Sequence, residues 1–344
     1  MITVMITGIG SNIGQGIIKA LNLSGMESRI IGTDIHPLAA GLFRCHKGYI
    51  VPLAGSNGWL EKMVEICTHE HVDMILIGSD GEVPFFSRKK TQIEKRTMAT
   101  VLVSNLTLVD SFQDKWKTAS LLSKYNFYHP KTCLNKPRFL KELKEQVGFP
   151  LVVKPKTGCG SHNFFVANNE KQLGGALAYV QDAIIQEYVD GEEFTSGIFF
   201  DKSSNVKGTI SLKRELKFGT TYRAISSHFK EVDEQMIKFS EILSQHGAIG
   251  PFNVQSRYCE GRVYILEINP RFSGTTPLRA FFNFNEVEAS LKHFLLNEEI
   301  QELNPSTGVA MRYFDELYVS LAQAEQIQES RRIMKPNCII PKVF

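Results

Sequence analysis

The first 110 or so residues alternate strand-like and helix-like segments, and this alternation limits the fold more than any other feature. Apolar strand-like segments lie at 2–10, 29–35, 48–53 and 72–80, with helical patterns at 13–25 and 59–71. Such alternation predicts a doubly wound parallel sheet, in which ligands lie beyond the carboxyl ends of the strands. Those ends contain Gly8 and Gly10, Asp34, and Ser79 with Asp80. A chain of 344 residues has room for two or three such compact units.

The composition excludes several classes of function. A net charge of +3 gives no reason to expect a nucleic-acid or acidic membrane partner. No apolar stretch approaches the roughly 20 residues that span a bilayer. The first residues have no basic signal-peptide region, and the six cysteines are scattered without a Cys-x-x-Cys pair. We therefore expect no disulfide framework and no zinc site, and a location in the reducing cytoplasm.

The pattern changes near residue 111. An amphipathic helix is predicted at 111–127, a second helix at 139–150, strand–glycine loop–strand at 151–167, a helix at 169–181, a strand at 183–191 and antiparallel strands to about 270, with a helical remainder and a tail after 335. The predicted units are a parallel-sheet domain (1–110), a linker helix with a small subdomain (111–187), an antiparallel-sheet subdomain (188–300) and a C-terminal helical region (301–344).

The segment GIGSNIGQG is close to a dinucleotide-binding fingerprint, with Gly8, Gly10 and Gly14 between a strand and a helix and Asp34 ending the next strand. The match is loose, because the third glycine follows the second by four positions rather than three. None of the ten tyrosines has a lysine four residues later, so the catalytic pair of a short-chain dehydrogenase is absent. Tight packing of strand against helix is the favoured interpretation.

The segment ILEINPRFSG places Glu267 and Asn269 two residues apart in an otherwise apolar strand, so both side chains share one face. A three-residue hairpin loop at 259–261 would put Gln255 opposite Ile265 and diagonal to Glu267. A two-residue loop would turn Gln255 to the other face. Carboxylate and amide oxygens are ligands that suit Mg²⁺. The alternative is a solvent-facing strand whose polar residues have no ligand.

A glycine-rich turn follows Lys154, and its backbone N–H groups could surround a phosphate. It contains Gly158, Gly160 and Ser161, but it lacks the spacing of a Walker loop. The alternative is a plain hairpin turn. Further along, the strand at 186–189 could offer backbone groups to an adenine edge, and Glu193 could accept from ribose hydroxyls.

These motifs, in this order, resemble the ATP-grasp superfamily, which includes carbamoyl phosphate synthase large subunits, biotin carboxylase and D-alanine–D-alanine ligase. The most specific part is Glu-Ile-Asn-Pro-Arg at 267–271 with Asn-Val-Gln at 253–255 upstream. The local pattern is most similar to the carbamoyl phosphate synthase type. The chain is too short for a whole such enzyme, and only one ATP-grasp unit is recognised. The pair Gln186-Glu187 departs from the Glu-Lys that many relatives have at the adenine contacts.

The resemblance implies a fold, a set of ligands and a role for each matching residue. It implies a doubly wound domain followed by an ATP-grasp fold with a small lid and a larger antiparallel sheet. The implied ligands are ATP and Mg²⁺, with Mn²⁺ as an alternative metal. The implied roles are metal binding by Glu267, Asn269 and Gln255; phosphate binding by Lys115 and Lys154; phosphate covering by Gly158, Gly160 and Ser161; adenine contacts from Gln186, Glu187 and Val189; ribose binding by Glu193; and stabilisation of the transferred phosphoryl group or the acceptor carboxylate by Arg271.

The chemistry that the resemblance implies is phosphorylation of a carboxylate by ATP, followed by attack of an amine on the acyl phosphate. In the segment 211–229, the basic residues Arg214, Lys217 and Arg223, together with Tyr222, suit an anionic acceptor, and a solvated charged hairpin is the alternative. The expected partners are small acids and amines, whose identity stays open, and a homodimer is one open assembly state. A non-catalytic nucleotide-binding subunit with the same fold is the alternative function.

Overall fold

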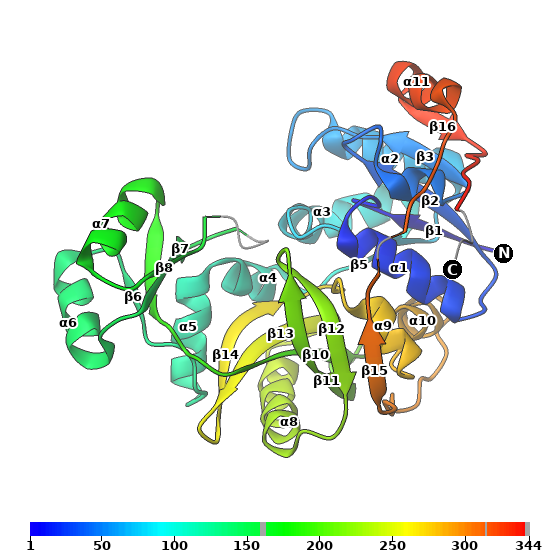
Figure 1. The fold of residues 1–344 in the computed structure, drawn as a ribbon. Coiled ribbons are helices and arrows are strands. Elements are labelled where there is room, and N and C mark those ends of the chain that lie inside the picture. The colour runs from blue at the N-terminus through cyan, green and yellow to red at the C-terminus, as the bar shows by residue number, and fades with distance from the viewer. Residues whose placement is uncertain (159–162, 314, 341–344) are drawn as a thin grey trace.

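The computed structural model describes residues 1–158, 163–313 and 315–340, and it contains three sheets. The N-terminal sheet has the order β16-β3-β2-β1-β4-β5, in which β1 to β5 are parallel (Figure 1). Its elements are β1 (Ile2–Ile6), α1 (Asn12–Leu23), β2 (Ser28–Asp34), η1 (Ala40–Phe43), β3 (Lys47–Ile50), α2 (Trp59–Glu70), β4 (Met74–Leu76), α3 (Val83–Thr97) and β5 (Thr100–Leu102). The predicted parallel-sheet domain is confirmed.

The linker consists of two helices rather than the single predicted one, α4 (Leu106–Gln113) and α5 (Lys115–Lys124). They are separated at Asp114, whose backbone is extended and whose carboxylate accepts from the amides of Trp116 and Lys117 at 2.9 and 3.2 Å. An aspartate that caps a helix competes with the helical continuation of the preceding turn. The break places Lys115 in the first turn of α5.

The lid, residues 132–187, is a four-stranded antiparallel sheet with the order β6-β9-β7-β8. Its elements are β6 (Thr132–Leu134), α6 (Pro137–Val147), β7 (Leu151–Pro155), β8 (Phe165–Ala167), α7 (Glu170–Tyr179) and β9 (Ala183–Glu187). The two helices pack on one face of the sheet around a small apolar core. Figure 1 shows the lid set apart from the rest of the molecule.

The central sheet has six strands in the order β14-β13-β10-β11-β12-β15. Its elements are β10 (Glu192–Phe200), β11 (Val206–Lys217), β12 (Thr220–Ser226), α8 (Lys230–Gln245), β13 (Gly250–Cys259) and β14 (Arg262–Asn269). Helix α8 covers one face of this sheet (Figure 1) and corrects the expectation of strands alone up to residue 270. Val232, Met236, Phe239 and Leu243 are buried at helical spacing, so the signal was present in the sequence.

The C-terminal part contains helices, as predicted, but also two short strands that we did not predict. Its elements are α9 (Thr276–Phe281), α10 (Glu286–Ser290), η2 (Leu291–Leu295), β15 (Gly308–Met311), α11 (Leu321–Ser330) and β16 (Arg332–Met334). Strand β15 extends the central sheet beside β12, and β16 pairs antiparallel with β3 of the N-terminal sheet. Strands of three or four residues are too short for a periodic signal, and they form here because sheet edges are already present.

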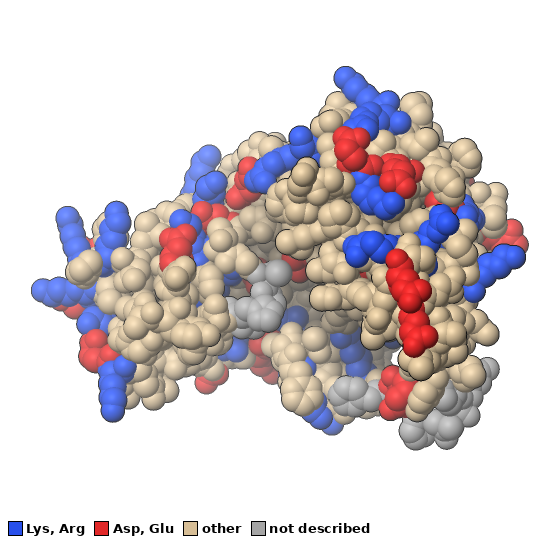
Figure 2. Space-filling model, turned by 90° about the horizontal axis from the view of Figure 1, so that it is seen from above, with Lys and Arg blue, Asp and Glu red and all other residues tan. Residues whose placement is uncertain are grey.

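The N-terminal domain and the central sheet share one core. Helix α1 lies against α9, where a side chain on Gly16 would meet the ring of Pro277 at 3.0 Å. Phe272, Val287 and Leu291 are buried in the same apolar cluster as the strands of the N-terminal sheet. Seen from above, the surface is hollowed between the lid and this joined part (Figure 2). No helix in the described part of the chain is long and apolar enough to cross a membrane.

Candidate active site

The β13–β14 hairpin differs from the predicted one in two ways that compensate each other. Its loop has two residues, Glu260 and Gly261, both with positive φ, and not the three that we expected. That loop alone would turn Gln255 to the wrong face. The register shifts by one residue at Leu266, so that Gln255 lies directly opposite Glu267. Because of the bulge, Gln255 and Glu267 share one face, as we predicted, although the loop length on which that prediction rested was wrong.

Asn253 and Asn269 form a second cross-strand pair on the face that Gln255 and Glu267 share. We call these four residues the polar strand face. Asn269 is opposite Asn253, just as Glu267 is opposite Gln255. Asn269 is 6% exposed, and its Nδ2 has no hydrogen-bond partner among the described residues. Asn253 Oδ1 accepts from the hydroxyl of Thr195 at 2.8 Å. We predicted no role for Asn253, although its spacing of two from Gln255 places it on the same strand face.

Lys154 of the lid faces the central sheet. Burial lowers the pKa of Lys154 to about 8, the negative charge of Glu267 opposes that shift, and the positive charge of Lys115 adds to it. Lys115 of α5 and Glu267 of β14 are therefore within electrostatic reach of Lys154 of β7. The Nζ of Lys115 donates to the carbonyl of Gly158 at 2.7 Å, which ties the linker to the glycine turn. Gly160 and Ser161, which we also predicted in this site, lie outside the described residues.

Glu193 and Gln255 are both held by Arg214. The Nη2 of Arg214 donates to Glu193 at 2.7 Å and to Gln255 Oε1 at 3.0 Å, and Arg257 lies 3.5 Å from the other Glu193 oxygen. The Arg214 side chain is 9% exposed. Three residues predicted to contact ribose, metal and acceptor therefore form one network on neighbouring strands of the central sheet. In the described structure, neither Glu193 nor Gln255 is free of protein contacts.

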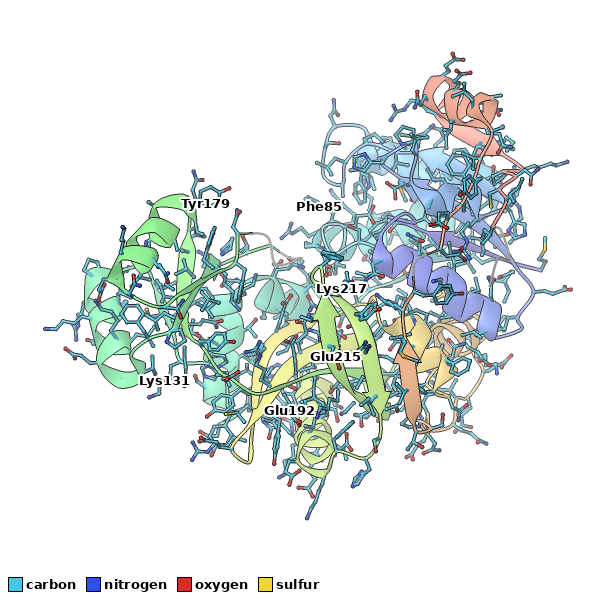
Figure 3. The ribbon with its side chains drawn as sticks, viewed as in Figure 1. Phe85, Lys131, Tyr179, Glu192, Glu215 and Lys217 are labelled. Carbon is cyan, nitrogen blue, oxygen red and sulfur yellow. The ribbon has the colours of Figure 1, made fainter. Side chains whose placement is uncertain are left out.

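The other predicted acceptor residues lie nearer the turn of the β11–β12 hairpin than Arg214 does, and Arg223 is opposite Glu215, the residue after Arg214. Lys217 lies 5.1 Å from the ring of Tyr222, and Arg223 pairs with Glu215 at 3.1 Å (Figure 3). The structure therefore does not bring the four predicted acceptor residues together. A hairpin turn at Gly219 was correctly predicted, but strand alternation sends Arg214 inward and Arg223 outward.

Backbone groups of the β9 segment are less available than we predicted. Gln186 lies in the central strand β9 and pairs with Thr132 on one side and Val152 on the other, so its backbone groups are used within the sheet. Its side chain is buried and donates to Thr132 at 2.7 Å. The Glu187 carboxylate accepts from the Lys131 amide at 3.0 Å, and the Val189 carbonyl accepts from Arg257 at 2.5 Å.

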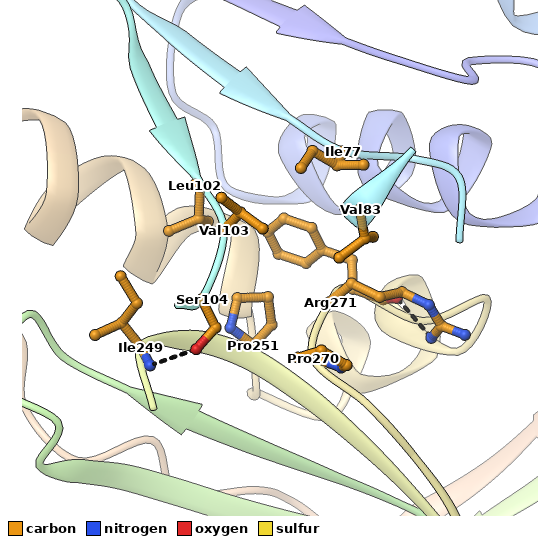
Figure 4. Close-up of a pocket in the computed structure, with 10 residues that line it drawn as sticks. Ile77, Val83, Leu102, Val103, Ser104, Ile249, Pro251, Pro270 and Arg271 are labelled. Atoms are coloured by element: carbon orange, nitrogen blue, oxygen red, sulfur yellow. Dashed lines mark hydrogen bonds between the residues drawn. The ribbon is translucent and has the colours of Figure 1, made fainter. Parts of the chain in front are cut away.

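Arg271 is paired across the junction of two domains. Its Nε donates to Asp80, in the loop after β4, and its Nη1 donates to the carbonyl of Phe272 at 2.8 Å (Figure 4). Beside it is a small crevice, with room for about one water, whose lining is mostly apolar: Ile77, Val83, Leu102, Val103, Ser104, Ile249, Pro251, Pro270, Arg271 and Phe272. The crevice is far too small for a nucleotide.

The buried ion pair of Arg279 and Glu286, which we did not predict, contacts the polar strand face through Asn253. Arg279 and Glu286 are both fully buried, with Nη1 and Oε2 3.5 Å apart. Burial lowers the pKa of Arg279 and raises that of Glu286, and each partner opposes the shift of the other. Arg279 donates to Asn253 Oδ1, and its guanidinium lies against Gly197, where a Cβ would approach to 2.7 Å. Only the glycine leaves space for this arginine.

The glycine loop after β1 is packed as the favoured interpretation predicted. A Cβ on Gly14 would lie 2.5 Å from the Gly8 carbonyl, and the Gly10 amide donates to Asp34 at 2.8 Å. Nearby, Glu82 is buried and accepts from the Thr7 hydroxyl at 2.6 Å. Burial raises the pKa of Glu82 to about 7. Nothing in the sequence distinguished this carboxyl from a surface residue.

Family models match two parts of the chain. Residues 112–275 match the ATP-grasp domain, and residues 4–101 match the PylC-like N-terminal domain. Among curated proteins, the chain is 24% identical over 297 residues to the carbamoyl phosphate synthase arginine-specific large chain of Geobacillus stearothermophilus, covering 80% of this chain and 28% of that one. The large chain of a Clostridium botulinum strain is also 24% identical, over 330 residues. This chain spans less than a third of the length of these relatives.

Solved structures show the same fold at low identity. The ADP complex of the Staphylococcus aureus N5-carboxyaminoimidazole synthetase has a TM-score of 0.70 at 14% identity, covering 91% of this chain and 82% of that one. The biotin carboxylase domain dimer of Hydrogenobacter thermophilus 2-oxoglutarate carboxylase, in complex with MgADP, ADP and bicarbonate, has a TM-score of 0.69 at 15% identity, covering 89% and 73%. The predicted fold class and the predicted resemblance are confirmed.

Proposed function

From an ATP-grasp domain that follows a PylC-like N-terminal domain, we propose an ATP-dependent ligase that joins a carboxylate to an amine. The carboxylate would take the γ-phosphoryl group of ATP to give an acyl phosphate and ADP, and the amine would then displace phosphate. The observation that supports this proposal most directly is the convergence of Lys154, Lys115 and Glu267 from three elements on one space. Positioning and charge neutralisation are what phosphoryl transfer requires of a protein.

Lys154 and Lys115 are the proposed phosphate contacts. Lys154 is a half-buried cation within electrostatic reach of Glu267, and Lys115 is already bonded to the glycine turn that would cover the phosphates. A lysine acts on phosphate as a point charge and needs no fixed fork geometry. Of the proposed adenine contacts, Gln186 would shape the pocket through its packing, because its backbone is used in the sheet, while Glu187 and Val189 lie at the end of the strand. Glu193 remains the proposed ribose contact and would have to share its carboxylate with Arg214.

Glu267 and Asn269 are the proposed Mg²⁺ ligands, with Gln255 as a supporting residue rather than a direct one. The buried Asn269 Nδ2 lacks a partner in the described structure, so its amide is not committed to the core. No group of three or more His, Cys, Asp or Glu side chains among the described residues is arranged to hold a metal. One carboxylate, one amide and substrate phosphates form a donor set that suits Mg²⁺. When bound, the ion would neutralise charge on the phosphates.

Arg271 is the proposed oxyanion contact. It follows the metal strand directly, and its planar fork suits a carboxylate or phosphoryl group better than a lysine would. Arg214 is the one predicted acceptor residue that lies beside the strand face, so we propose it as a structural support for Gln255 and Glu193. Lys217, Tyr222 and Arg223 remain proposed acceptor contacts at the hairpin end.

The experiment is a screen of small acids and amines for ADP release from MgATP. We expect ADP release that requires both an acid and an amine, with one amide bond formed for each ATP consumed. Nucleotide binding without acid-dependent ADP release would favour the alternative, a non-catalytic nucleotide-binding subunit. The assembly state is a separate measurement by light scattering, and a dimer is the state named for the Hydrogenobacter thermophilus biotin carboxylase domain.

A further inference from the structure

Three arginines lie near the polar strand face, and each has its own carboxylate. Arg279 pairs with Glu286, Arg214 pairs with Glu193 at 2.7 Å, and Arg271 pairs with Asp80. The positive charges of Arg271 and Arg214 both contribute to the lowered pKa of Arg279, so the three guanidinium groups are within electrostatic reach of one another. An anionic ligand entering this region would meet three cations that are already neutralised.

The three pairs differ in how readily a ligand could replace the carboxylate. Arg279 and Glu286 are fully buried, and Arg214 with Glu193 lies within the central sheet. Asp80 is 19% exposed, close to the 17% of Glu193, but Glu193 has a second arginine, Arg257, at 3.5 Å, and Asp80 comes from a loop of the other domain. It joins Arg271 only through its side chain, and the described contacts show no second bond that fixes its carboxylate. Among these three carboxylates, Asp80 can leave its arginine with the least disruption.

The surroundings of Arg271 favour an exchange of side chains over an opening of the domains. Pro270 and Phe272, on either side of Arg271, line one small crevice together with Ile77 and Val83, which flank the Asp80 loop. The crevice between the two segments is narrow, with room for about one water (Figure 4). The guanidinium is also held by the Phe272 carbonyl, so its orientation would persist when Asp80 turns away. Nothing apolar needs to separate for another carboxylate to take the place of Asp80.

We propose that Asp80 is a positioning residue that occupies the place of the acceptor carboxylate on Arg271 until the substrate replaces it. This inference rests on the proposed ligase function. The Asp80 carboxylate holds Arg271 in a neutralised pair when no acid is bound. The arginine is then less available to the γ-phosphoryl group. The attack of water on that group is therefore less well stabilised. An acid that binds must displace Asp80, so ATP is consumed mainly when an acceptor is present.

The test is ADP release from MgATP alone, with no acid added, for Asp80→Asn in the full chain. The amide keeps the size of the side chain and removes its charge. We expect acid-independent ADP release to rise about tenfold, because Arg271 loses its competing carboxylate. Asp80→Glu keeps a carboxylate on a longer arm and is expected to stay near the wild-type rate. For any acid found in the screen, Asp80→Asn should lower the KM and leave kcat nearly unchanged.

A matched control is Asp110→Asn, which removes the carboxylate of an exposed Arg88–Asp110 pair elsewhere in the molecule. It should leave acid-independent ADP release unchanged. If Asp80→Asn does not fold, Asp80→Ala is the second variant, with thermal unfolding measured beside it. Wild-type rates in Asp80→Asn, together with lower thermal stability, would mean that the pair is only structural and would overturn the inference. A wild-type protein that releases no ADP with any acid would overturn the proposed function itself.

Discussion

The lid and the rest of the molecule, here called the body, differ in how their cores are built. Among the described residues, the apolar core of the lid consists only of residues from Cys133 to Ile185. The body core of the N-terminal domain includes residues from the first 102 positions, from 272–291 and from 327–333. A core assembled from distant segments cannot separate without unfolding, whereas a self-contained one can move as a unit.

This difference divides the candidate site into a fixed half and a movable half. Glu267, Asn269 and Arg271 lie on or just after β14, and the Phe272 carbonyl orients Arg271. Lys154 and Gly158 belong to the lid and its glycine turn. The body therefore fixes the groups that need accurate geometry, and the lid brings charge over the nucleotide. Substitutions in the two halves should affect different measured quantities.

The largest expected effect comes from the fixed half. Glu267→Gln should lower the rate of ADP release by about 10²–10³, the size of loss expected for an electrostatic group at the reacting centre. Thermal unfolding should be nearly unchanged, because Glu267 is only partly buried. Glu260→Gln, at the exposed end of the same hairpin, is the control and should behave as wild type. A Glu267→Gln enzyme with more than a tenth of wild-type activity would contradict the metal assignment.

The second prediction concerns the stability of the body. The pKa of Glu82 is raised from 4.5 to about 7. In the unfolded chain the carboxyl ionises near 4.5, so folding is penalised increasingly as pH rises from 4.5 to 7, and by a constant amount above that. Glu82→Gln should then stabilise the protein at pH 8 by up to about 3 kcal/mol, with the gain disappearing near pH 4.5. Urea unfolding at both pH values is the measurement.

The matched control for Glu82 is Glu65→Gln, on the exposed side of α2. It should change the free energy of unfolding little at either pH. A Glu82→Gln variant that is equally destabilised at pH 5 and pH 8 would mean that the carboxyl is needed for packing with Thr7. Ionisation of Glu82 would then not be what lowers the free energy of unfolding.

Much of this fold could be predicted because its signals are local. Alternating strands and helices, the glycine turn and the pair Glu267 and Asn269 are all patterns within a dozen residues. Helix α8 had the same kind of signal, and its buried positions at 232, 236, 239 and 243 were overlooked. The short strands β15 and β16 were not predictable, because their stability comes from sheet edges that are distant in sequence.

The parts of the site that could not be predicted depend on long-range geometry. The bulge at Leu266 determines which face Gln255 occupies, and no residue at that position predicts a bulge. The Arg271–Asp80 pair joins residues 191 positions apart. Arg214 looked like an exposed acceptor contact in a basic hairpin, but strand alternation and the register with β10 turned it inward toward Glu193. Side-chain pairing across strands needs the register, which the sequence alone does not supply.

The third prediction separates the movable half from the fixed half. Because the pKa of Lys154 is lowered to about 8, the ammonium is charged below that pH and increasingly neutral above it. The affinity for an ATP analogue should therefore fall as pH rises from 8 to 9.5, by up to about tenfold for each pH unit. In Lys154→Arg the guanidinium stays charged, so the affinity should be flat over this range. Isothermal titration at several pH values measures both.

Lys156→Arg is the control for this pH profile. Lys156 lies two residues away, but its contact with Asp182 raises its pKa, so it stays charged throughout. The control should keep the wild-type pH dependence. An unchanged slope in Lys154→Arg would show that another group titrates, and Lys154 would lose its role as a phosphate contact.

The smallest expected effects test the comparison of the two cores directly with one substitution in each. Gly16 lies in α1 against Pro277, which a Cβ would meet at 3.0 Å, whereas a Cβ added to Gly174, in α7 of the lid, would have no atom within 4 Å. In a helix, alanine is favoured over glycine by roughly 0.5–1 kcal/mol. Gly174→Ala should therefore stabilise the lid by about that amount. At Gly16 the gain is outweighed by crowding, which typically costs about 1–3 kcal/mol, so Gly16→Ala should destabilise the body by about 1 kcal/mol.

Amide hydrogen exchange resolves the two regions, because Gly174→Ala should slow exchange only in the lid and Gly16→Ala should speed it only in the body. If either substitution changes exchange equally in both regions, lid and body unfold as one unit, and the division between a fixed and a movable half is wrong.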